Sequence, residues 1–335
     1  MLNNTTRHDD QGFEAALDAA RRAPHRPAAA DPASLALIAL AERVALREVT
    51  VLIGGPTGTG KEGLARLIHS SSPRRDAPFV AVNCAALPEA MLEALLFGHE
   101  RGAFTGAQAS AKGLLRAAHG GTLLLDEIAE LPLGSQAKLL RALQEREVLA
   151  IGASTAVQID VRVVATANRD LAAEVAAGRF RDDLYYRLAV FPLATTRLAA
   201  RPADIVPITA ALLLRLAGAN PPRPTAAALA RLTAHDWPGN VRELGNVLER
   251  ALVHADGPRI EAHDIVFDAG PQPVEPARPL PMQVREREHD MIRRTLDGCA
   301  GRRIDAARHL GISERTLRYK LAAMGAALPA GSRVQ

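Results

Sequence analysis

Residues 55–62 read Gly55-Pro56-Thr57-Gly58-Thr59-Gly60-Lys61-Glu62 and connect two patterned segments. The apolar run from Val49 to Ile53 precedes them, and a helical pattern from Glu62 to His69 follows. A strand, a glycine-rich turn and a helix start are the layout of a phosphate-binding loop, in which backbone N–H groups and the helix N-terminus face the phosphates. Lys61 would reach the β- and γ-phosphate oxygens. The order of these elements therefore predicts a nucleotide site formed by all eight residues.

Two features of this loop keep a second interpretation open at this point. Glycine turns also occur without any ligand. In addition, the position after Lys61 carries Ser or Thr for Mg²⁺ in the general pattern, and here it is Glu62. The choice between a nucleotide site and an ordinary glycine turn therefore depends on the rest of the chain.

The composition bounds the class of protein. The chain has 335 residues, of which 48% are hydrophobic and 23% charged, as in a soluble globular protein of two or three domains. Cys84 and Cys299 are the two cysteines, so a disulfide framework is not expected. No apolar run reaches membrane-spanning length, no signal peptide is recognisable, and the ten histidines show no metal-ligand spacing. We expect a cytoplasmic protein with no membrane partner.

A pair of carboxylates follows a second apolar run. Residues 120–125 read as a turn and a strand, and Asp126 and Glu127 come directly after them. In a nucleotide hydrolase the first carboxylate holds Mg²⁺, usually through water, and the second polarises the attacking water. Following a phosphate-binding loop in the same chain, the pair predicts a nucleotide hydrolase in which Asp126 holds Mg²⁺ and Glu127 polarises the attacking water.

Two further apolar runs end in amide side chains. Phe79 to Val82 leads to Asn83, and Val161 to Ala167 leads to Asn168. Strands that alternate with helices and carry polar residues at their carboxyl ends indicate a parallel sheet covered by helices on both faces. The predicted fold class is therefore α/β.

Phe97 to Ala107, with the sequence FGHERGAFTGA, is poor material for a core because a phenylalanine stands between small residues and glycines. Such a segment favours a mobile loop with an aromatic tip. On residues 102–107, GAFTGA, together with the motifs above, the chain resembles the sigma-54-dependent transcriptional activators, bacterial enhancer-binding proteins of the AAA+ class. The resemblance extends roughly from Ser34 to Gly325.

This resemblance implies roles for several residues. The loop would contact sigma-54 through Gly102, Ala103, Phe104, Thr105, Gly106 and Ala107, with Phe104 and Thr105 at the tip. Family members carry an acid after the loop lysine, so Glu62 becomes expected. Asn83 matches the switch asparagine that restrains Glu127, and Asn168 matches the sensor that reads the γ-phosphate. The implied cofactors are ATP and Mg²⁺, and the implied assembly is a hexameric ring.

The resemblance also assigns three arginines. Arg181 and Arg187 correspond to the arginine fingers that a subunit offers to its neighbour's ATP, where a planar guanidinium stabilises charge on the transferred phosphoryl group. Without the resemblance, both would be interpreted as members of surface ion pairs. Arg242 lies in the sensor II segment of a small helical lid, and Trp237 is expected in the core of that lid.

Four positions depart from the residues usual in the family. Pro56 stands in place of an acid, Leu95 and Arg116 in place of glutamate, and Ala199 in place of arginine. We expect these departures to weaken ion pairs between subunits or around the loop, with an effect on the ATPase rate.

The C-terminal part reads as a DNA-binding domain. Residues 281–335 hold eleven Lys or Arg and six Asp or Glu, and two predicted helices flank Gly311 with Ala307 and Leu317 facing a core. The segment resembles the Fis-type helix-turn-helix, with wording closest to the flagellar regulators of the family; a small dimerisation bundle is the alternative. Double-stranded DNA would be contacted by Arg302, Arg303, Ser313, Glu314, Arg315, Arg318, Tyr319 and Lys320.

The expected domain order follows from these segments. It comprises a flexible N-terminal arm or single docked helix (1–30), an AAA+ α/β subdomain (31–200), an all-α lid (201–267), a proline-rich linker (268–282), an all-α helix-turn-helix domain (283–325) and a tail (326–335).

The resulting hypothesis is an ATP-dependent activator of the sigma-54 RNA polymerase holoenzyme that remodels the closed promoter complex from upstream DNA. No N-terminal sensory domain is expected, so activity would be constitutive or controlled by a separate protein. The alternatives are an AAA+ remodeller of another client and a DNA-binding repressor with a vestigial ATPase.

Overall fold

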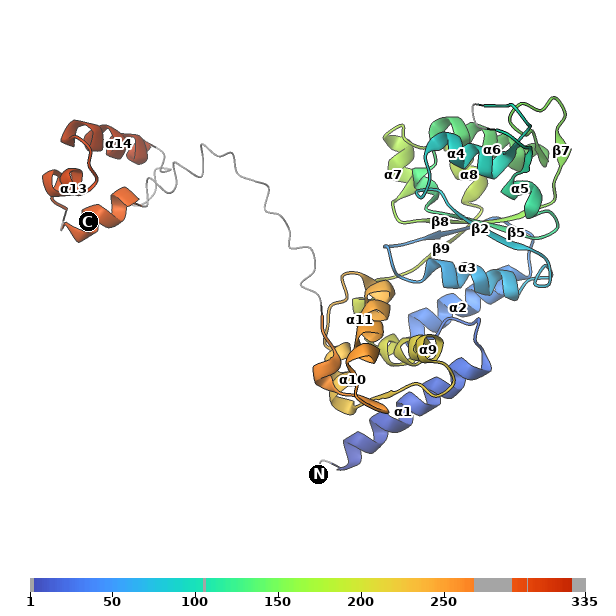
Figure 1. The fold of residues 1–335 in the computed structure, drawn as a ribbon, viewed down its shortest axis with the longest axis horizontal. Coiled ribbons are helices and arrows are strands. Elements are labelled where there is room, and N and C mark those ends of the chain that lie inside the picture. Colours follow the sequence, from blue (N-terminus) through green and yellow to red (C-terminus); the bar gives the residue numbers. More distant parts are fainter. Residues whose placement is uncertain (1–2, 105–106, 268–290, 300, 327–335) are drawn as a thin grey trace. The chain divides into compact units, whose positions relative to one another are not determined.

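The computed structural model describes residues 3–104, 107–267, 291–299 and 301–326 of the chain (Figure 1). They belong to two compact units, Met1–Asp268 and Ala269–Gln335. Thr105 and Gly106, the predicted linker 268–282 and residues 327–335 lie outside the described residues. None of the described helices is long and apolar enough to cross a lipid bilayer.

The first unit contains a five-stranded sheet in which every strand is parallel to its neighbours. The strand order is β2-β5-β8-β1-β9, with the bounds β1 (Val51–Gly54), β2 (Phe79–Asn83), β5 (Thr122–Asp126), β8 (Arg162–Ala167) and β9 (Phe191–Ala194). β5 and β8 are buried along nearly their whole length, which explains their almost continuous apolar sequence. The predicted parallel α/β sheet is confirmed.

Helices cover both faces of this sheet (Figure 1). On one face, α2 (Pro32–Ala45) and α3 (Lys61–Ser70) pack through a core that includes Ile38, Ile53 and Ile68. The other face carries α4 (Glu89–Phe97), α5 (Leu114–Ala117), α6 (Leu133–Glu145), α7 (Leu171–Ala176) and α8 (Asp182–Leu188). Short elements between them are β3 (Gly98–His99), β4 (Ala111–Lys112), the 3₁₀ turn η1 (Ile128–Glu130), β6 (Glu147–Val148) and β7 (Val157–Gln158).

A helical lid follows the sheet. Its elements are η2 (Leu198–Ala200), η3 (Pro202–Asp204), α9 (Ile205–Ala217), β10 (Arg223–Pro224), α10 (Ala226–Thr233), α11 (Asn240–His254), β11 (Arg259–Ile260) and η4 (Ala262–Asp264). Trp237 is 1% exposed in the lid core, and its Nε1 donates a hydrogen bond to the carbonyl oxygen of Leu232 at 2.9 Å. Trp237 is therefore a core residue of the lid, as predicted.

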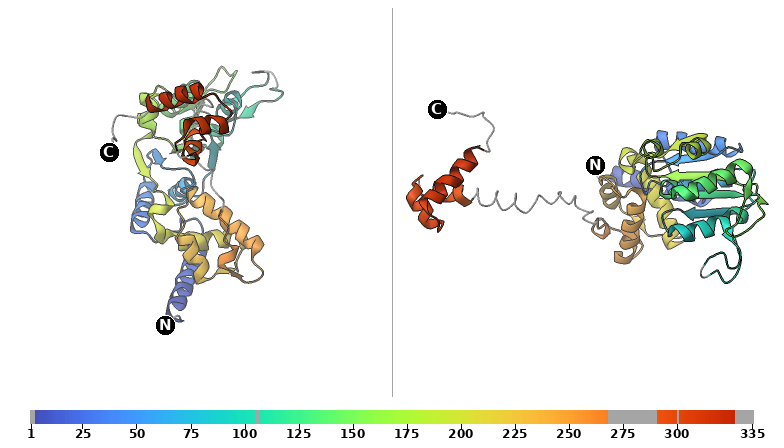
Figure 2. Two further views of the ribbon diagram at one scale, coloured as in Figure 1. Left: turned by 90° about the vertical axis from the view of Figure 1, so that its left-hand side faces the viewer. Right: turned by 90° about the horizontal axis from the view of Figure 1, so that it is seen from above.

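The N-terminal segment corrects the expectation of a flexible arm. A helix, α1 (Asn3–Arg22), replaces the short helix expected from Phe13 onward, and it lies beside α9 of the lid (Figure 2). The side chains of Phe13 and Leu17 are 2% and 0% exposed and belong to the lid's apolar core. Of the two alternatives, the docked helix is the one present, because the lid supplies the apolar surface that this segment lacks on its own.

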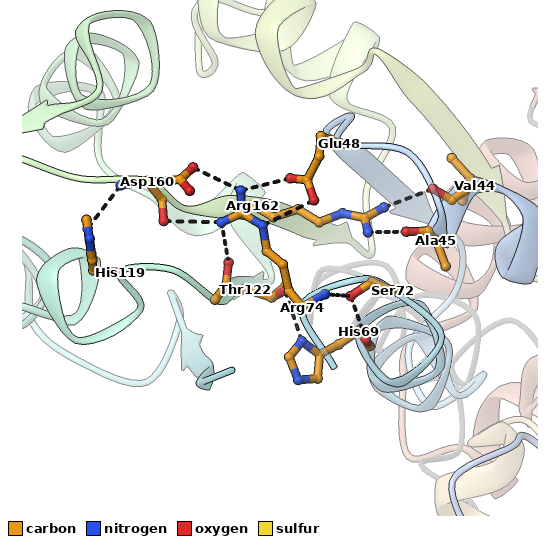
Figure 3. A network of polar contacts seen from close by, with 11 residues as sticks. Val44, Ala45, Glu48, His69, Ser72, Arg74, His119, Thr122, Asp160 and Arg162 are labelled. Carbon is orange, nitrogen blue, oxygen red and sulfur yellow. Dashed lines mark hydrogen bonds and ion pairs between the residues drawn. The ribbon is translucent and has the colours of Figure 1, made fainter. Parts of the chain in front are cut away.

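A polar network lies at the amino edge of the sheet, where β5 and β8 begin (Figure 3). Arg162, at the start of β8, donates hydrogen bonds to the carbonyl oxygens of Val44 and Ala45 at 3.0 and 2.6 Å, and so satisfies the C-terminal end of α2. His69 Nδ1 lies 3.0 Å from the Oγ1 atom of Thr122, at the start of β5. These contacts stabilise the amino edge of the sheet. The predicted phosphate-binding loop and carboxylate pair lie at the opposite, carboxyl edge.

The second unit is a small helical cluster. Residues 291–298 are helical, and α13 (Arg303–His309) and α14 (Glu314–Ala326) follow. Gly311 takes the turn between them with φ 67°, in the left-handed region that glycine tolerates best. Ala307 and Leu317 are buried in the shared core, as predicted.

Candidate nucleotide site

The phosphate-binding loop joins β1 to α3 at the carboxyl edge of the sheet. Gly55 and Gly58 have φ values of 135° and 77°, and Cβ atoms at these positions would lie 2.2 Å from Thr195 Oγ1 and 2.4 Å from the carbonyl oxygen of Gly239. Both positions therefore require glycine. The resulting loop has the tight curvature that brings backbone N–H groups toward a phosphate.

Lys61 begins α3 and is 8% exposed. Its Nζ donates hydrogen bonds to the carbonyl oxygens of Gly55 and Pro56 at 2.7 and 2.9 Å. Burial lowers the pKa of Lys61, while the charges of Asp126 and Glu127 act in the opposite direction. Pro56 contributes only its carbonyl to this contact, so the acid usual at that position is not needed for it.

A cavity of about 790 Å³ lies over this loop. Residues 57–64 of the loop and α3, both carboxylates at the end of β5, and Arg242 of the lid line it together with residues of the N-terminal segment, such as Ala28. The structure thus brings Lys61, Asp126, Glu127 and Arg242, which lie far apart in the sequence, to one cavity. Its size and lining suit a nucleotide.

Thr166 holds the two carboxylate positions together. Its hydroxyl donates to Asp126 Oδ1, and its Oγ1 accepts a hydrogen bond from the backbone N–H of Glu127 at 3.1 Å. Glu127 has φ 55°, so its backbone turns sharply at the strand end. Thr166 is not among the site residues predicted from the sequence; the signal there is one hydroxyl residue within the otherwise apolar run from Val163 to Ala167, and its side chain is buried.

The two amides at strand ends lie at the same edge. Asn83 is opposite Asp126 in the register of β2 and β5. Its Oδ1 accepts a hydrogen bond from the N–H of Ala85 at 2.8 Å, and none of the described hydrogen bonds joins it to Glu127. The predicted restraint of Glu127 by Asn83 is therefore not formed in this structure. Asn168, after β8, has a buried Oδ1 without a hydrogen-bond partner, and it is not among the residues that line the cavity.

The lid closes on the phosphate-binding loop through the start of α11. Val241 N–H donates a hydrogen bond to the carbonyl oxygen of Gly58 at 2.9 Å, and Asn240 Nδ2 donates to that of Thr57 at 3.0 Å. Arg242 follows directly and lines the cavity. Arg242 is expected at this site from the sequence, whereas Asn240 is not, because the hydrogen-bond partners of Asn240 are distant in the chain.

The two predicted finger arginines lie elsewhere. Arg181 forms an ion pair with Asp183 at 2.7 Å, and Arg187 donates a hydrogen bond to the carbonyl oxygen of Leu143 at 2.7 Å. Among the described residues that line the nucleotide cavity, neither arginine is present. Neither arginine therefore lines the nucleotide cavity of its own chain in this structure.

The predicted sigma-54 loop hangs between β3 and β4, which pair antiparallel. Gly102 N–H donates a hydrogen bond to the carbonyl oxygen of Ala107 at 2.9 Å and so closes the base of the loop. Phe104 is 44% exposed, with its ring 5.0 Å from that of His99. The aromatic side chain of this loop is thus open to solvent and accessible to a partner.

In the second unit, α14 carries most of the residues predicted to contact DNA. Tyr319 is 78% exposed, and Arg318 forms an ion pair with Glu314 at 2.6 Å on the helix surface. Ser313 caps the helix by accepting a hydrogen bond from the N–H of Thr316 at 3.1 Å. Of the other predicted contact residues, Arg315 and Lys320 lie in α14, Arg303 begins α13, and Arg302 directly precedes α13.

Three family descriptions match the chain in succession. The sigma-54 interaction domain matches residues 28–194, the AAA+ ATPase lid domain residues 199–278, and the bacterial regulatory protein, Fis family, residues 283–324. The three regions follow the sheet, the lid and the C-terminal helices in order.

Relatives with these regions are known from several bacteria. The response regulator protein FleR of Pseudomonas aeruginosa is 52% identical over 332 residues, covering 89% of this chain and 70% of FleR. The transcriptional regulatory protein FlbD of Caulobacter vibrioides is 47% identical, covering 87% of this chain and 68% of FlbD. The crystal structure of NtrX from Brucella abortus in complex with ATP matches with a TM-score of 0.63 and 33% identity, covering 89% of this chain and 68% of NtrX.

These matches agree with the geometry of the loop, the carboxylates and the lid. More than half of the residues aligned with FleR are identical, and the alignment covers over two thirds of that protein. A similarity of this extent goes far beyond a shared fold. The chain therefore belongs to the sigma-54-dependent transcriptional activators, with an AAA+ P-loop ATPase domain, its helical lid and a DNA-binding domain of the Fis family.

Proposed function

We propose that the chain assembles into a hexameric ring, hydrolyses ATP between adjacent subunits, and uses the resulting movement of its GAFTGA loop to remodel a closed sigma-54 promoter complex. The observation that carries the proposal is the exposed Phe104, in a loop that leaves the same α/β part that forms the nucleotide cavity. The loop's sequence is the hallmark of the family to which the chain belongs.

The catalytic roles follow from the cavity. Lys61 and the loop N–H groups would bind the phosphates, and Glu127 would orient and deprotonate the attacking water. Mg²⁺, when bound, neutralises charge on the phosphate oxygens. Asp126 would hold it, and because no cluster of three metal-ligating side chains occurs among the described residues, water and phosphate would complete its shell. The partnerless Oδ1 of Asn168 would accept a hydrogen bond from a water or hydroxyl at the γ-phosphate end.

The position of the two predicted finger arginines supports a ring. Arg181 and Arg187 do not line the cavity of their own chain, so they would complete the site of a neighbouring subunit. Hydrolysis would then depend on assembly, which couples the ATPase to the oligomer.

Substitution Thr105→Ala tests the loop. The purified variant should hydrolyse ATP like the wild type but fail to form open complexes with sigma-54 polymerase on a promoter with an upstream site. Equal open-complex formation by both proteins would remove the loop from its role, and a lack of binding to sigma-54 with a trapped ATP analogue would favour another client. Adding candidate regulatory proteins to the same assay distinguishes constitutive activity from control by a partner.

A further inference from the structure

Asp204 is a fully buried carboxylate at the start of the lid, and the catalytic scheme above does not use it. It is 0% exposed and ends η3, directly before α9. A buried carboxylate is costly unless several donors surround it. Its partners therefore show what it holds in place.

One carboxylate oxygen of Asp204 binds the backbone of the N-terminal segment. Oδ1 accepts hydrogen bonds from the backbone N–H groups of Ala30 and Asp31 at 2.7 and 2.8 Å. The residues just before them, Ala28 and Ala29, line the nucleotide cavity. This oxygen consequently fixes one wall of the cavity to the lid.

The other oxygen reaches the phosphate-binding loop through an arginine. Oδ2 accepts from Ser34 Oγ at 2.5 Å and pairs with Arg201 Nη1 at 3.3 Å. The second terminal nitrogen of the same guanidinium, Nη2, donates to the carbonyl oxygen of Thr59 at 2.8 Å. Thr59 precedes Gly60 and Lys61, so this contact acts on the part of the loop that binds phosphate.

We propose that Asp204 is a positioning residue for nucleotide binding. Through the N–H groups of residues 30 and 31 and through Arg201, it holds the cavity wall at residues 28 and 29 at a fixed distance from the phosphate-binding loop. The planar fork of Arg201 can bind a carboxylate and a carbonyl at the same time, and an ammonium group on a single stem cannot replace it in both contacts. Asp204 itself does not line the cavity. Its effect is on how well the two ends of the cavity fit one ligand.

Asp204→Asn tests the proposal because it keeps the shape of the side chain. The amide NH₂ group would face either the two backbone N–H groups or the donors of Ser34 and Arg201, so one set loses its acceptor. We expect the Kd of a fluorescent ATP analogue to rise about tenfold or more, the factor typical of losing a hydrogen bond to a charged group.

The matched control is Asp264→Asn, in the lid. Asp264 is 4% exposed and accepts a hydrogen bond from Glu261 N–H at 2.8 Å, but it does not line the cavity. This variant should lower the melting temperature and leave the Kd unchanged. A purely structural role for Asp204 would give the two variants the same behaviour, so an equal Kd in both would overturn the proposal.

Arg201→Lys provides a second route if Asp204→Asn does not fold. Lysine keeps the charge but cannot serve Asp204 and Thr59 together, so its Kd should also rise, with far-UV circular dichroism confirming the fold. A folded Arg201→Lys protein whose Kd stays within twofold of the wild type would contradict the relay through Arg201.

Discussion

The side chain of Asn240 ties the lid to the carbonyl group of Thr57 in the phosphate-binding loop, with 3.0 Å between Nδ2 and the oxygen. Its Oδ1 accepts a hydrogen bond from Leu198 N–H at 2.8 Å, and the residue is 2% exposed. Asn240 has φ 54°, a backbone conformation that asparagine and glycine tolerate. Movement of the lid relative to the loop must break this contact.

Asn240→Gly should therefore loosen the lid without straining the backbone. Losing two buried hydrogen bonds should reduce the free energy of unfolding by about 1–3 kcal/mol, measured by thermal denaturation with and without ADP. Arg146→Gly is the control, since Arg146 has a similar φ of 56° but is exposed. A melting temperature of Asn240→Gly as high as that of the control would refute the role of the tether.

Glu127→Gln should separate binding from hydrolysis. The amide keeps the size of the side chain but cannot accept a proton, so phosphate release should slow by about 10² to 10⁴-fold while ATP still binds. Glu130→Gln, which removes a charge from a surface ion pair with Arg169, should retain the wild-type rate. Undiminished turnover by Glu127→Gln would exclude Glu127 as the base.

Mixing two inactive variants tests whether Arg187 acts on a neighbouring subunit. Arg187→Ala should lose activity by a factor of about 10³ or more if it is a finger, and Lys61→Ala should fail to bind ATP. In mixed oligomers, the intact nucleotide site of an Arg187→Ala subunit can lie next to the intact Arg187 of a Lys61→Ala subunit. Part of the ATPase activity should therefore return. Mixing Lys61→Ala with Glu127→Gln should restore none, because both lesions lie in the same site. Absence of recovery in the first mixture would place the finger in its own chain's site or outside catalysis.

His69 should make stability depend on pH. Burial and the charge of Arg162 lower the pKa of His69 below its ordinary value of 6.5. The folded state then binds fewer protons than the unfolded state, so stability is complete above pH 6.5 and falls as the pH drops below it toward the folded pKa. Melting temperatures of wild type and His69→Gln between pH 7 and pH 5 check this, and the variant should show a flatter profile; identical slopes would contradict it.

The docking of α1 predicts that its apolar residues stabilise the lid. Leu17→Ala should lower the free energy of unfolding by about 2–5 kcal/mol, as in other buried leucine truncations. Leu46→Ala, at a position that is 64% exposed, should change it little. If the two variants had the same melting temperature, the docking of α1 would contribute nothing to stability, and residues 12–22 would behave as the flexible arm that their polar sequence suggests.

Much of the site could be predicted because its residues follow local patterns. A glycine-rich turn after an apolar run predicts a phosphate-binding loop, and carboxylates after Leu125 lie at the sheet edge by the rules of parallel topology. Family resemblance added Arg242 and the two fingers, which no spacing would have shown.

The rest depends on partners that are distant in the chain. Asp204 and the N–H of Ala30 are separated by 174 positions, and Asn240 and Thr57 by 183. Phe13 and Leu17 are buried only because they pack into the core of the lid. The mostly polar sequence around them therefore does not by itself indicate a docked helix. For Asn83, the family pattern suggested a contact with Glu127, but a local turn with Ala85 satisfies the amide oxygen instead.

Gly58 has a consequence for how the protein tolerates change. A methyl group there would come within 2.4 Å of the Gly239 carbonyl, so even alanine would act as a wedge that drives the lid outward while every phosphate-binding group remains in the sequence. In an activity assay this inactivation would resemble the loss of a catalytic residue, although its cause would be a lid that can no longer close on the phosphate-binding loop.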